Sequence, residues 1–317
     1  MADTILSRGP ANVTTLLTTT LENYRKEMQD NIFDEVLTVK WLKEKSKVSL
    51  SGGATIVEPL MYGTNSAGQW FDGFDQVNVT PQEGFTQAQY QWKMVEVPVS
   101  VSDKEENVQN SGEAKQFDIV QQKLKQAELS LTDLLNAQLF DDSIGSKEMD
   151  SLVTVIDGTG TIGEINSSTY PWWAADENSG GSFAAQGLSD MLTLYNALRV
   201  EGAKTDAIIT RPTEEAYYEA AVRPHLRIAS EKSGDLGFGR LTYKGIPIIA
   251  DNDATSGVMY FVDSRHLSFY ARDNRNMFLT DFIRPVNQLA KTALLVMVCQ
   301  LGTNNRRRLG KITGISA

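Results

Sequence analysis

The side chains that could perform chemistry are few and far apart in this sequence of 317 residues. The two histidines, His225 and His266, lie in no motif that pairs histidine with a metal ion or a nucleophile. The single cysteine, Cys299, excludes an intrachain disulfide and argues against a thiolate metal site. There is no Walker loop, no Gly-x-Ser-x-Gly elbow and no zinc-ligand spacing. We therefore predict a protein without catalytic residues, cofactor or bound metal.

Two short motifs are reminiscent of ligand-binding loops. Residues 158–163 spell Gly-Thr-Gly-Thr-Ile-Gly, the glycine pattern of a dinucleotide-binding loop, and a strand candidate at 152–156 precedes them. That loop binds pyrophosphate only where it opens a helix. The residues that follow, which include Pro171, cannot open one, so we interpret the segment as part of a surface loop. Asp251-Asn-Asp253 could begin a metal loop, but no further carboxylates stand at ligand spacing, and a turn is favoured.

The longest periodic segment, residues 110–143, is the element around which the chain is organised. Its apolar residues recur at spacings of three and four, namely Phe117, Val120, Leu124, Ala127, Leu131 and Leu134, with Leu135 and Leu139 widening the stripe. This period predicts a long amphipathic helix that begins at Asn110 and ends before Gly145. We expect it to cross a domain and pack on a sheet. A coiled-coil seam is the alternative, although Gln138 falls on that seam.

Residues 52–98 form a ribbon with few apolar positions. We predict strands at 54–59, 75–80 and 86–97, with a hairpin turn at 81–84. Ordering such a ribbon costs about 1–2 kcal/mol of backbone entropy per residue, and isolated hairpins are marginally stable. It carries a dense aromatic set: Trp70, Phe71, Phe74, Phe85, Tyr90 and Trp92. These rings either pack under their own domain or form a subunit contact, and the sequence leaves both open.

From residue 182 onward the pattern is α/β. Helices are expected at 188–198 and from Pro212, and strands at 207–210, 241–250, 258–262, 291–301 and 311–315. Pro247 would place its strand at a sheet edge, and residues 304–308, which include three arginines, form a turn. At the other end of the sequence, Leu17, Leu21, Tyr24 and Met28 stand at helical spacing in a narrow amphipathic arm.

The charge and composition of the chain argue against several classes of function. The net charge of −10 opposes a general affinity for nucleic acid, and only 306–308 form a basic run. The first residues lack the pattern of a secretion signal, and the longest apolar run is too short to span a bilayer. We expect a soluble protein that is made in a cytoplasm. An α/β enzyme would account only for residues 182–270.

The order of these elements resembles a known family. The polar arm, the aromatic hairpin and the transition at residues 97–103 into a long helix come first. Tyr243-x-Gly245-Ile-Pro247, Tyr260-Phe-Val-Asp263 and the ending from Gln300 to Gly314 complete the pattern. Together they are similar to the major capsid proteins of tailed bacteriophages, with the Hong Kong 97-type fold. Encapsulins share that fold and are the nearest alternative.

The resemblance implies an α+β subunit that builds a shell. It implies an N-terminal arm (1–50), an extended E-loop hairpin (51–98), a peripheral domain with the spine helix (99–165 and 280–317) and an axial domain (166–279). Such subunits assemble in the bacterial host cytoplasm as hexamers and pentamers. The shell that they build is the virion capsid, which encloses double-stranded DNA. Portal, scaffolding and decoration proteins are the expected partners. Some members weld neighbouring subunits through an E-loop lysine, but here the ribbon has only Lys93, near its base.

Overall fold

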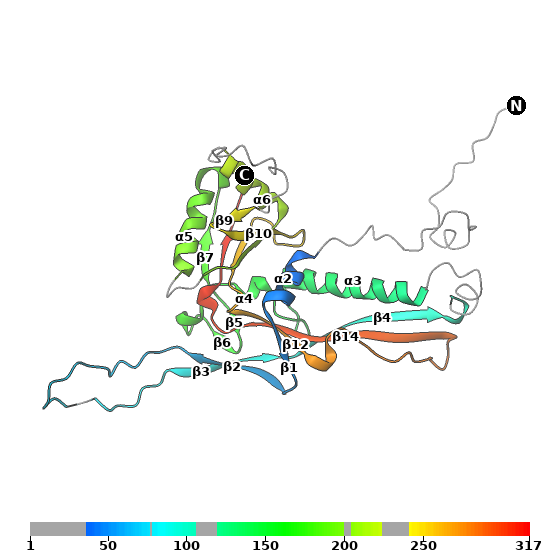
Figure 1. Ribbon diagram of the computed structural model, residues 1–317, viewed down its shortest axis with the longest axis horizontal. Coiled ribbons are helices and arrows are strands. Elements are labelled where there is room, and N and C mark those ends of the chain that lie inside the picture. The colour runs from blue at the N-terminus through cyan, green and yellow to red at the C-terminus, as the bar shows by residue number, and fades with distance from the viewer. Residues whose placement is uncertain (1–35, 77, 106–118, 200–203, 224–240) are drawn as a thin grey trace.

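The computed structural model describes residues 36–76, 78–105, 119–199, 204–223 and 241–317. The molecule is elongated (Figure 1). A two-stranded hairpin projects from one side, a long strand pair with helix α3 above it extends to the other, and an α/β unit stands over the middle (Figure 1). Residues 1–35 of the predicted N-terminal arm, the predicted start of the spine helix and His225 lie outside the described residues.

A five-stranded sheet forms the long axis. Its strands follow the order β1-β12-β14-β13, and the fifth strand, β4, also pairs with β14. They are β1 (Lys47–Leu50), β4 (Lys93–Ser102), β12 (Leu267–Arg272), β13 (Phe278–Leu279) and β14 (Ala290–Thr303). The predicted strand at 291–301 is therefore confirmed, and its apolar run is explained by burial of both faces from Met297 onward. The ladder between β4 and β14 is antiparallel and runs from the Lys93–Cys299 pair to the Ser102–Ala290 pair.

Helix α3 (Ile119–Leu139) packs on β4, so the predicted sheet packing is confirmed and the coiled-coil alternative is wrong for this chain. Ala127, Leu131, Leu135 and Leu139 are buried at successive spacings of four. Leu134 was predicted to share this stripe, but its side chain is 51% exposed. The helix rests on one sheet face only, so a single i, i+4 row is covered and the residue beside that row is not.

The two neighbouring leucines of α3 give a matched test of this packing. We expect Leu131→Ala to destabilise the subunit by about 2–5 kcal/mol, because the side chain is fully buried and its removal leaves a cavity. Leu134→Ala makes the same chemical change at an exposed site and should cost about 0.5 kcal/mol or less. Urea unfolding of dissociated subunits measures both. Equal losses for the two variants would contradict the orientation of the helix.

The α/β unit is built on a six-stranded sheet in the order β7-β15-β11-β8-β10-β9. The strands are β7 (Asp176–Ser179), β8 (Ala207–Thr210), β9 (Thr242–Tyr243), β10 (Ile246–Ala250), β11 (Met259–Val262) and β15 (Gly310–Thr313). Helix α5 (Leu188–Leu198) packs on β7 and β15, and α6 (Pro212–Val222) packs on β10. These predicted helices are confirmed, as are the strands at 207–210, 258–262 and 311–315.

Three strand predictions need correction. The strand expected at 241–250 is two strands, because Lys244 and Gly245 have positive φ and form a tight turn, and the sheet edge is β9 rather than the strand with Pro247. The strand expected at 152–156 is helix α4 (Leu152–Val155), which Ser151 and Thr154 begin with a capping box. The third strand, expected at 75–80, is not formed, because the described residues of this segment pair with no other segment.

The hairpin itself is formed by β2 (Thr55–Met61) and β3 (Phe85–Gln91). The predicted turn at 81–84 is therefore wrong, because residues 62–84 together form one long loop between the two strands. The strand predicted at 86–97 is interrupted at Trp92, where β3 ends and β4 begins. The remaining short elements are α2 (Leu37–Lys45), β5 (Thr161–Ile162), β6 (Ile165–Asn166), η2 (Pro171–Trp173), η3 (Phe183–Gly187), η6 (Asp273–Arg275) and η7 (Arg306–Arg308).

A buried aspartate ties the α/β unit to the helices below it. Thr38 of α2 donates its hydroxyl to Asp251 Oδ2 at 2.6 Å, and Asn136 of α3 donates Nδ2 to Asp251 Oδ1 at 2.9 Å. Asn136 Nδ2 also lies 2.7 Å from Asp253 Oδ2. The Asp251-Asn-Asp253 segment is thus a turn, as predicted, whose carboxylates are used in hydrogen bonds between elements.

Candidate assembly surfaces

The residues first considered for chemistry have structural roles. His266 precedes β12, where its Nδ1 lies 2.8 Å from Asn304 Oδ1. Cys299 is buried in β14, and burial raises the pKa of its thiol to about 12, so the thiolate is not formed at neutral pH. Within the described part of the chain, no three His, Cys, Asp or Glu side chains are grouped to hold a metal ion.

None of the helices described here is long and apolar enough to cross a membrane.

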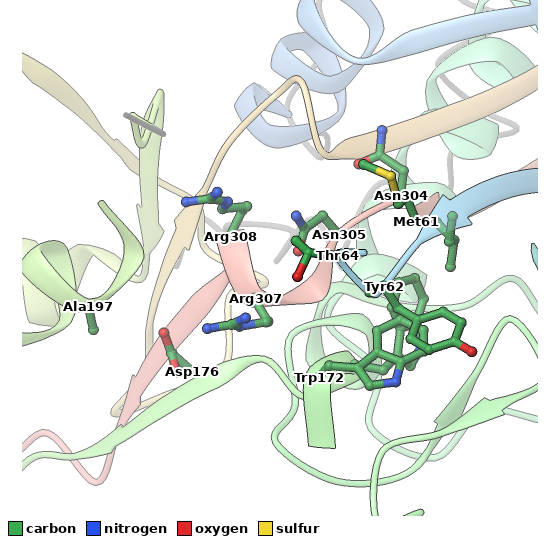
Figure 2. A pocket seen from close by; sticks show the side chains of 13 residues that line it. Met61, Tyr62, Thr64, Trp172, Asp176, Ala197, Asn304, Asn305, Arg307 and Arg308 are labelled. Carbon is green, nitrogen blue, oxygen red and sulfur yellow. The ribbon is translucent and has the colours of Figure 1, made fainter. Parts of the chain in front are cut away.

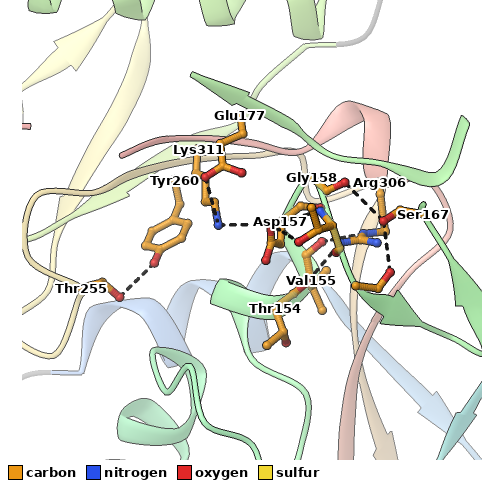
Figure 3. Close-up of polar contacts among 12 residues, drawn as sticks. Thr154, Val155, Asp157, Gly158, Ser167, Glu177, Thr255, Tyr260, Arg306 and Lys311 are labelled. Atoms are coloured by element: carbon orange, nitrogen blue, oxygen red, sulfur yellow. Dashed lines mark hydrogen bonds and ion pairs between the residues drawn. The ribbon is translucent and has the colours of Figure 1, made fainter. Parts of the chain in front are cut away.

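The segment from α4 into the glycine-rich motif, residues 154–159, surrounds an arginine. Arg306 is fully buried, and its Nε donates to Val155 O at 3.0 Å (Figure 3). Its Nη2 donates to the carbonyl groups of Thr154, Asp157 and Thr159 (Figure 3). A pyrophosphate loop presents amide N–H groups to its ligand, whereas Thr159 of this motif presents its carbonyl oxygen to a cation. The turn predicted at 304–308 contains the short helix η7, and within it Arg306 is buried and fastens β15 to the segment after α4.

The last glycine of that segment holds the root of the hairpin. Gly163 has φ +60° in the turn between β5 and β6, and Gln89 of β3 donates its N–H to Gly163 O at 3.0 Å. A Cβ on Gly163 would lie 2.7 Å from the Cβ of Ala88. Glycine is therefore required by the backbone conformation and by the close approach of β3. The motif that resembled a cofactor loop supports the projecting ribbon.

Two of the six predicted interface aromatics belong to the chain's own core. Tyr90 is 1% exposed, and its hydroxyl donates to Thr303 O at 2.7 Å and accepts from Thr303 N at 3.1 Å. Trp92 is half-buried against the core and donates Nε1 to Gly53 O at 3.2 Å. Tyr90 is therefore corrected as an interface candidate, because its own chain covers it at the hairpin root, whereas the exposed part of Trp92 keeps that residue a prediction.

The other four aromatics are exposed and form what we call the aromatic tip: Trp70, Phe71, Phe74 and Phe85. Their exposed fractions are 102%, 66%, 105% and 79%. The loop that carries most of them has only local polar contacts, such as Ser66 Oγ to Gln82 Oε1 at 3.0 Å and Gln69 Nε2 to Gln76 O at 2.8 Å. No described residue of the chain covers these rings, so the tip is a large apolar surface without a partner in its own subunit.

A second exposed apolar set lies at the opposite end of the molecule, in the loop between β13 and β14 (Figure 1). We call it the far loop. Its apolar side chains are Phe282, Ile283, Val286 and Leu289, of which Val286 is 108% exposed. Strand β3 leads directly into β4 along the chain. The aromatic tip lies at one end of this continuous pair of strands, and the far loop lies at the other end. The sequence analysis missed this set. Its signal was a group of apolar residues around Pro285 between two strands.

No protein-family model matches the sequence, and no curated protein matches it. Solved structures match it over nearly the whole chain. A chain of the cyanophage A-1(L) capsid is 16% identical with a TM-score of 0.69, covering 96% of this chain and 98% of that one. The capsid of a native GTA particle has 11% identity and a TM-score of 0.66, with 93% and 96% covered.

The SrpI encapsulin of Synechococcus elongatus PCC 7942 is also similar, with 11% identity, a TM-score of 0.61, and 98% of this chain and 97% of that chain covered. At these identities the likeness establishes the fold. The chain has the Hong Kong 97-type capsid fold, as the resemblance predicted.

Proposed function

We propose that this chain is the major capsid protein of a tailed bacteriophage, which assembles through hexamers and pentamers into an icosahedral shell around double-stranded DNA. The observation that carries the proposal is the aromatic tip, because its rings are exposed on and beside the projecting hairpin loop and no described residue of the chain buries them. Burying a large apolar side chain contributes about 1.5–3 kcal/mol. The four rings together can therefore supply on the order of 10 kcal/mol toward association, before the entropy of association is subtracted.

The positions of the two exposed apolar sets favour a head-to-tail contact. The aromatic tip and the far loop differ in sequence and lie at opposite ends, so a contact between them is heterologous. Heterologous contacts generate rings when the rotation closes. Elongated subunits joined in this way form a capsomer, with the hairpin of each copy on the peripheral domain of the next.

We retain the proposed domain map with boundaries adjusted to strand membership. The E-loop ends at Trp92 rather than 98, because all of β4 belongs to the five-stranded sheet. The proposed peripheral domain gains β12, which pairs with β14, and the axial domain gains β15, which pairs with β11. By the same criterion β1 and β13 join the proposed peripheral domain, so the proposed arm ends at residue 46, and the rest of the map is unchanged.

DNA would be enclosed without tight binding, because a net charge of −10 supplies few cations to phosphate. Portal, scaffolding and decoration proteins remain proposed partners.

The encapsulin likeness makes a protein-filled compartment the second candidate function. Electron microscopy of particles recovered from the natural source, followed by analysis of nuclease-resistant contents, separates the two. Closed shells with duplex DNA support a capsid, whereas shells with a single protein cargo support an encapsulin. Small particles without any shell would contradict both.

Lys93 is placed where it cannot weld the hairpin loop to a neighbour. Its Nζ donates to Ser146 O of the same chain at 2.6 Å, and residues 62–84 contain no lysine. We therefore expect shells held by non-covalent contacts. Boiling purified shells in detergent should release one species at the monomer mass of 35.0 kDa. A ladder of oligomers that disappears on Lys93→Ala would contradict this expectation.

A further inference from the structure

The axial unit has a cationic notch on the side from which the hairpin projects. The notch is a cavity of about 280 Å³ between the end of β2, where the hairpin loop begins, and the edge of the six-stranded sheet at β7. Arg307 and Arg308 enter it from η7, Tyr62 and Trp172 form an aromatic wall, and Asp176 is the carboxylate among its lining residues (Figure 2). The two rings are stacked, with centroids 5.1 Å apart. Positive charge therefore exceeds negative charge in a recess that has an aromatic side.

Arg307 is the cation that this recess presents outward. Its side chain is exposed, and it forms no hydrogen bond or salt bridge with any residue that the structure describes. Asp176 is its nearest acidic neighbour in the recess: burial raises the pKa of the Asp176 carboxyl, and the positive charge of Arg307 lowers it in part. A guanidinium beside aromatic rings is well suited to a carboxylate, which it binds through two parallel hydrogen bonds.

A groove of complementary character lies on the other edge of the axial unit. It is a cavity of about 310 Å³ between α2, α6 and β10, whereas α5 and β7 lie on the notch side (Figure 1). Ile248 and Ile249 belong to its apolar lining, together with Trp41. Its charged lining residues are Glu44, Glu215 and Lys40. Acidic groups thus exceed basic ones beside an apolar floor, which is the reverse of the notch.

Glu215 is an incompletely compensated carboxylate in this groove. Burial raises its pKa, and the charge of Glu219 one helical turn later raises it further. Glu219 itself is paired with Arg223 at 2.7 Å. A cation supplied from outside the subunit would therefore stabilise ionised Glu215.

We propose that the Arg307 notch of one copy receives the Glu44–Glu215 edge of the next copy within the ring. This inference rests on the proposed function, because it names a second contact of the same head-to-tail interface. The rotation that brings the hairpin of one copy onto its neighbour also brings the notch edge toward the neighbour's α2–α6 edge, since hairpin and notch lie on the same side (Figure 1). The hairpin contact supplies apolar area, and the charge contact sets the register of the two axial domains.

Charge reversal with reciprocal rescue tests the pairing. Arg307→Glu and Glu215→Arg should each reduce the assembled fraction about tenfold or more, because each places like charges together. The combination should restore assembly to within about twofold of the wild type. Glu44→Arg, at an exposed site, provides a second acidic-edge variant in case Glu215→Arg does not fold. Arg272→Glu reverses the charge of an exposed arginine on β12 and should leave assembly unchanged.

Sedimentation and electron microscopy give the assembled fraction, and thermal unfolding of dissociated subunits shows that each variant folds. Wild-type protein that assembles while Arg307→Glu assembles equally well overturns this inference alone. Folded single variants that fail and are not rescued by either acidic-edge partner overturn the pairing and point to another anionic occupant of the notch. Wild-type protein that forms no rings or shells overturns the proposed function as well.

Discussion

Replacing Trp70 and Phe74 together with serine is expected to abolish shell assembly without destabilising the subunit. Both side chains are fully exposed in the single chain, so their removal creates no cavity in its core. In the assembled shell each substitution is expected to remove about 1.5–3 kcal/mol of the free energy that burial of the ring contributes. Because the loss is repeated at every subunit contact, a drop of about 1.4 kcal/mol per contact already weakens each one tenfold.

The measurement is the assembled fraction by sedimentation, together with the unfolding temperature of the subunit. Gln69→Ser is the matched control, because it shortens a polar side chain in the same loop and removes one local hydrogen bond. We expect the control to assemble normally. A Trp70→Ser, Phe74→Ser double variant that forms normal shells, or that unfolds at a much lower temperature than the wild type, would contradict the proposed role of the tip.

Replacing Arg306 with alanine is expected to destabilise the subunit by about 3–5 kcal/mol. The change removes a buried guanidinium and leaves the carbonyl groups of Thr154, Val155, Asp157 and Thr159 without that donor. These carbonyls belong to the segment that runs from α4 to the turn supporting the hairpin, so its order depends on the same side chain. For a domain of ordinary stability this loss is a large share of the total.

Arg307→Ala is the control for this experiment, because it truncates the adjacent arginine at an exposed position. Its unfolding free energy should change by about 0.5 kcal/mol or less. Urea unfolding is best performed in the assembly-deficient Trp70 and Phe74 background, which keeps every variant dissociated. Similar losses at the two positions would mean that Arg306 does not hold the segment after α4.

The elements whose sequence pattern matches their neighbours were predictable. Strand β14 is buried on both faces over its second half, and its continuous apolar run reflects that burial directly. The strands and helices of the α/β unit were similarly recognisable, because short apolar runs alternate with capped amphipathic helices. Local propensity and tertiary environment agree at these places.

The errors arose where pairing or burial depends on distant residues. Residues 75–80 have the composition of a strand, but a strand needs a partner and the described chain offers none there. The segment after Ser151 also has strand-like residues, yet the capping box formed with Thr154 starts a helical turn. Leu134 fits the helical period as well as Leu131 does, and only the position of the sheet decides between them.

The assembly surfaces were partly predictable. The aromatic density of the ribbon was visible in the sequence, but the separation of Tyr90 and Trp92 from the four exposed rings depends on where β3 crosses the turn at Gly163. Arg306 could not be distinguished from Arg307 and Arg308, because its burial follows from a loop that closes around it from more than 140 residues away. Sequence periodicity contains no information on such a contact.

Amide hydrogen exchange across residues 62–84, compared in dissociated subunits and in assembled shells, tests most directly whether a second copy covers the hairpin loop. We expect exchange near the unprotected rate in subunits, since the loop has few backbone hydrogen bonds, and strong protection in shells. The core strand β14 should be protected in both states and serves as the internal reference. Equal exchange of residues 62–84 in subunits and shells, with β14 protected throughout, would contradict the proposal that neighbouring copies are held together through this loop.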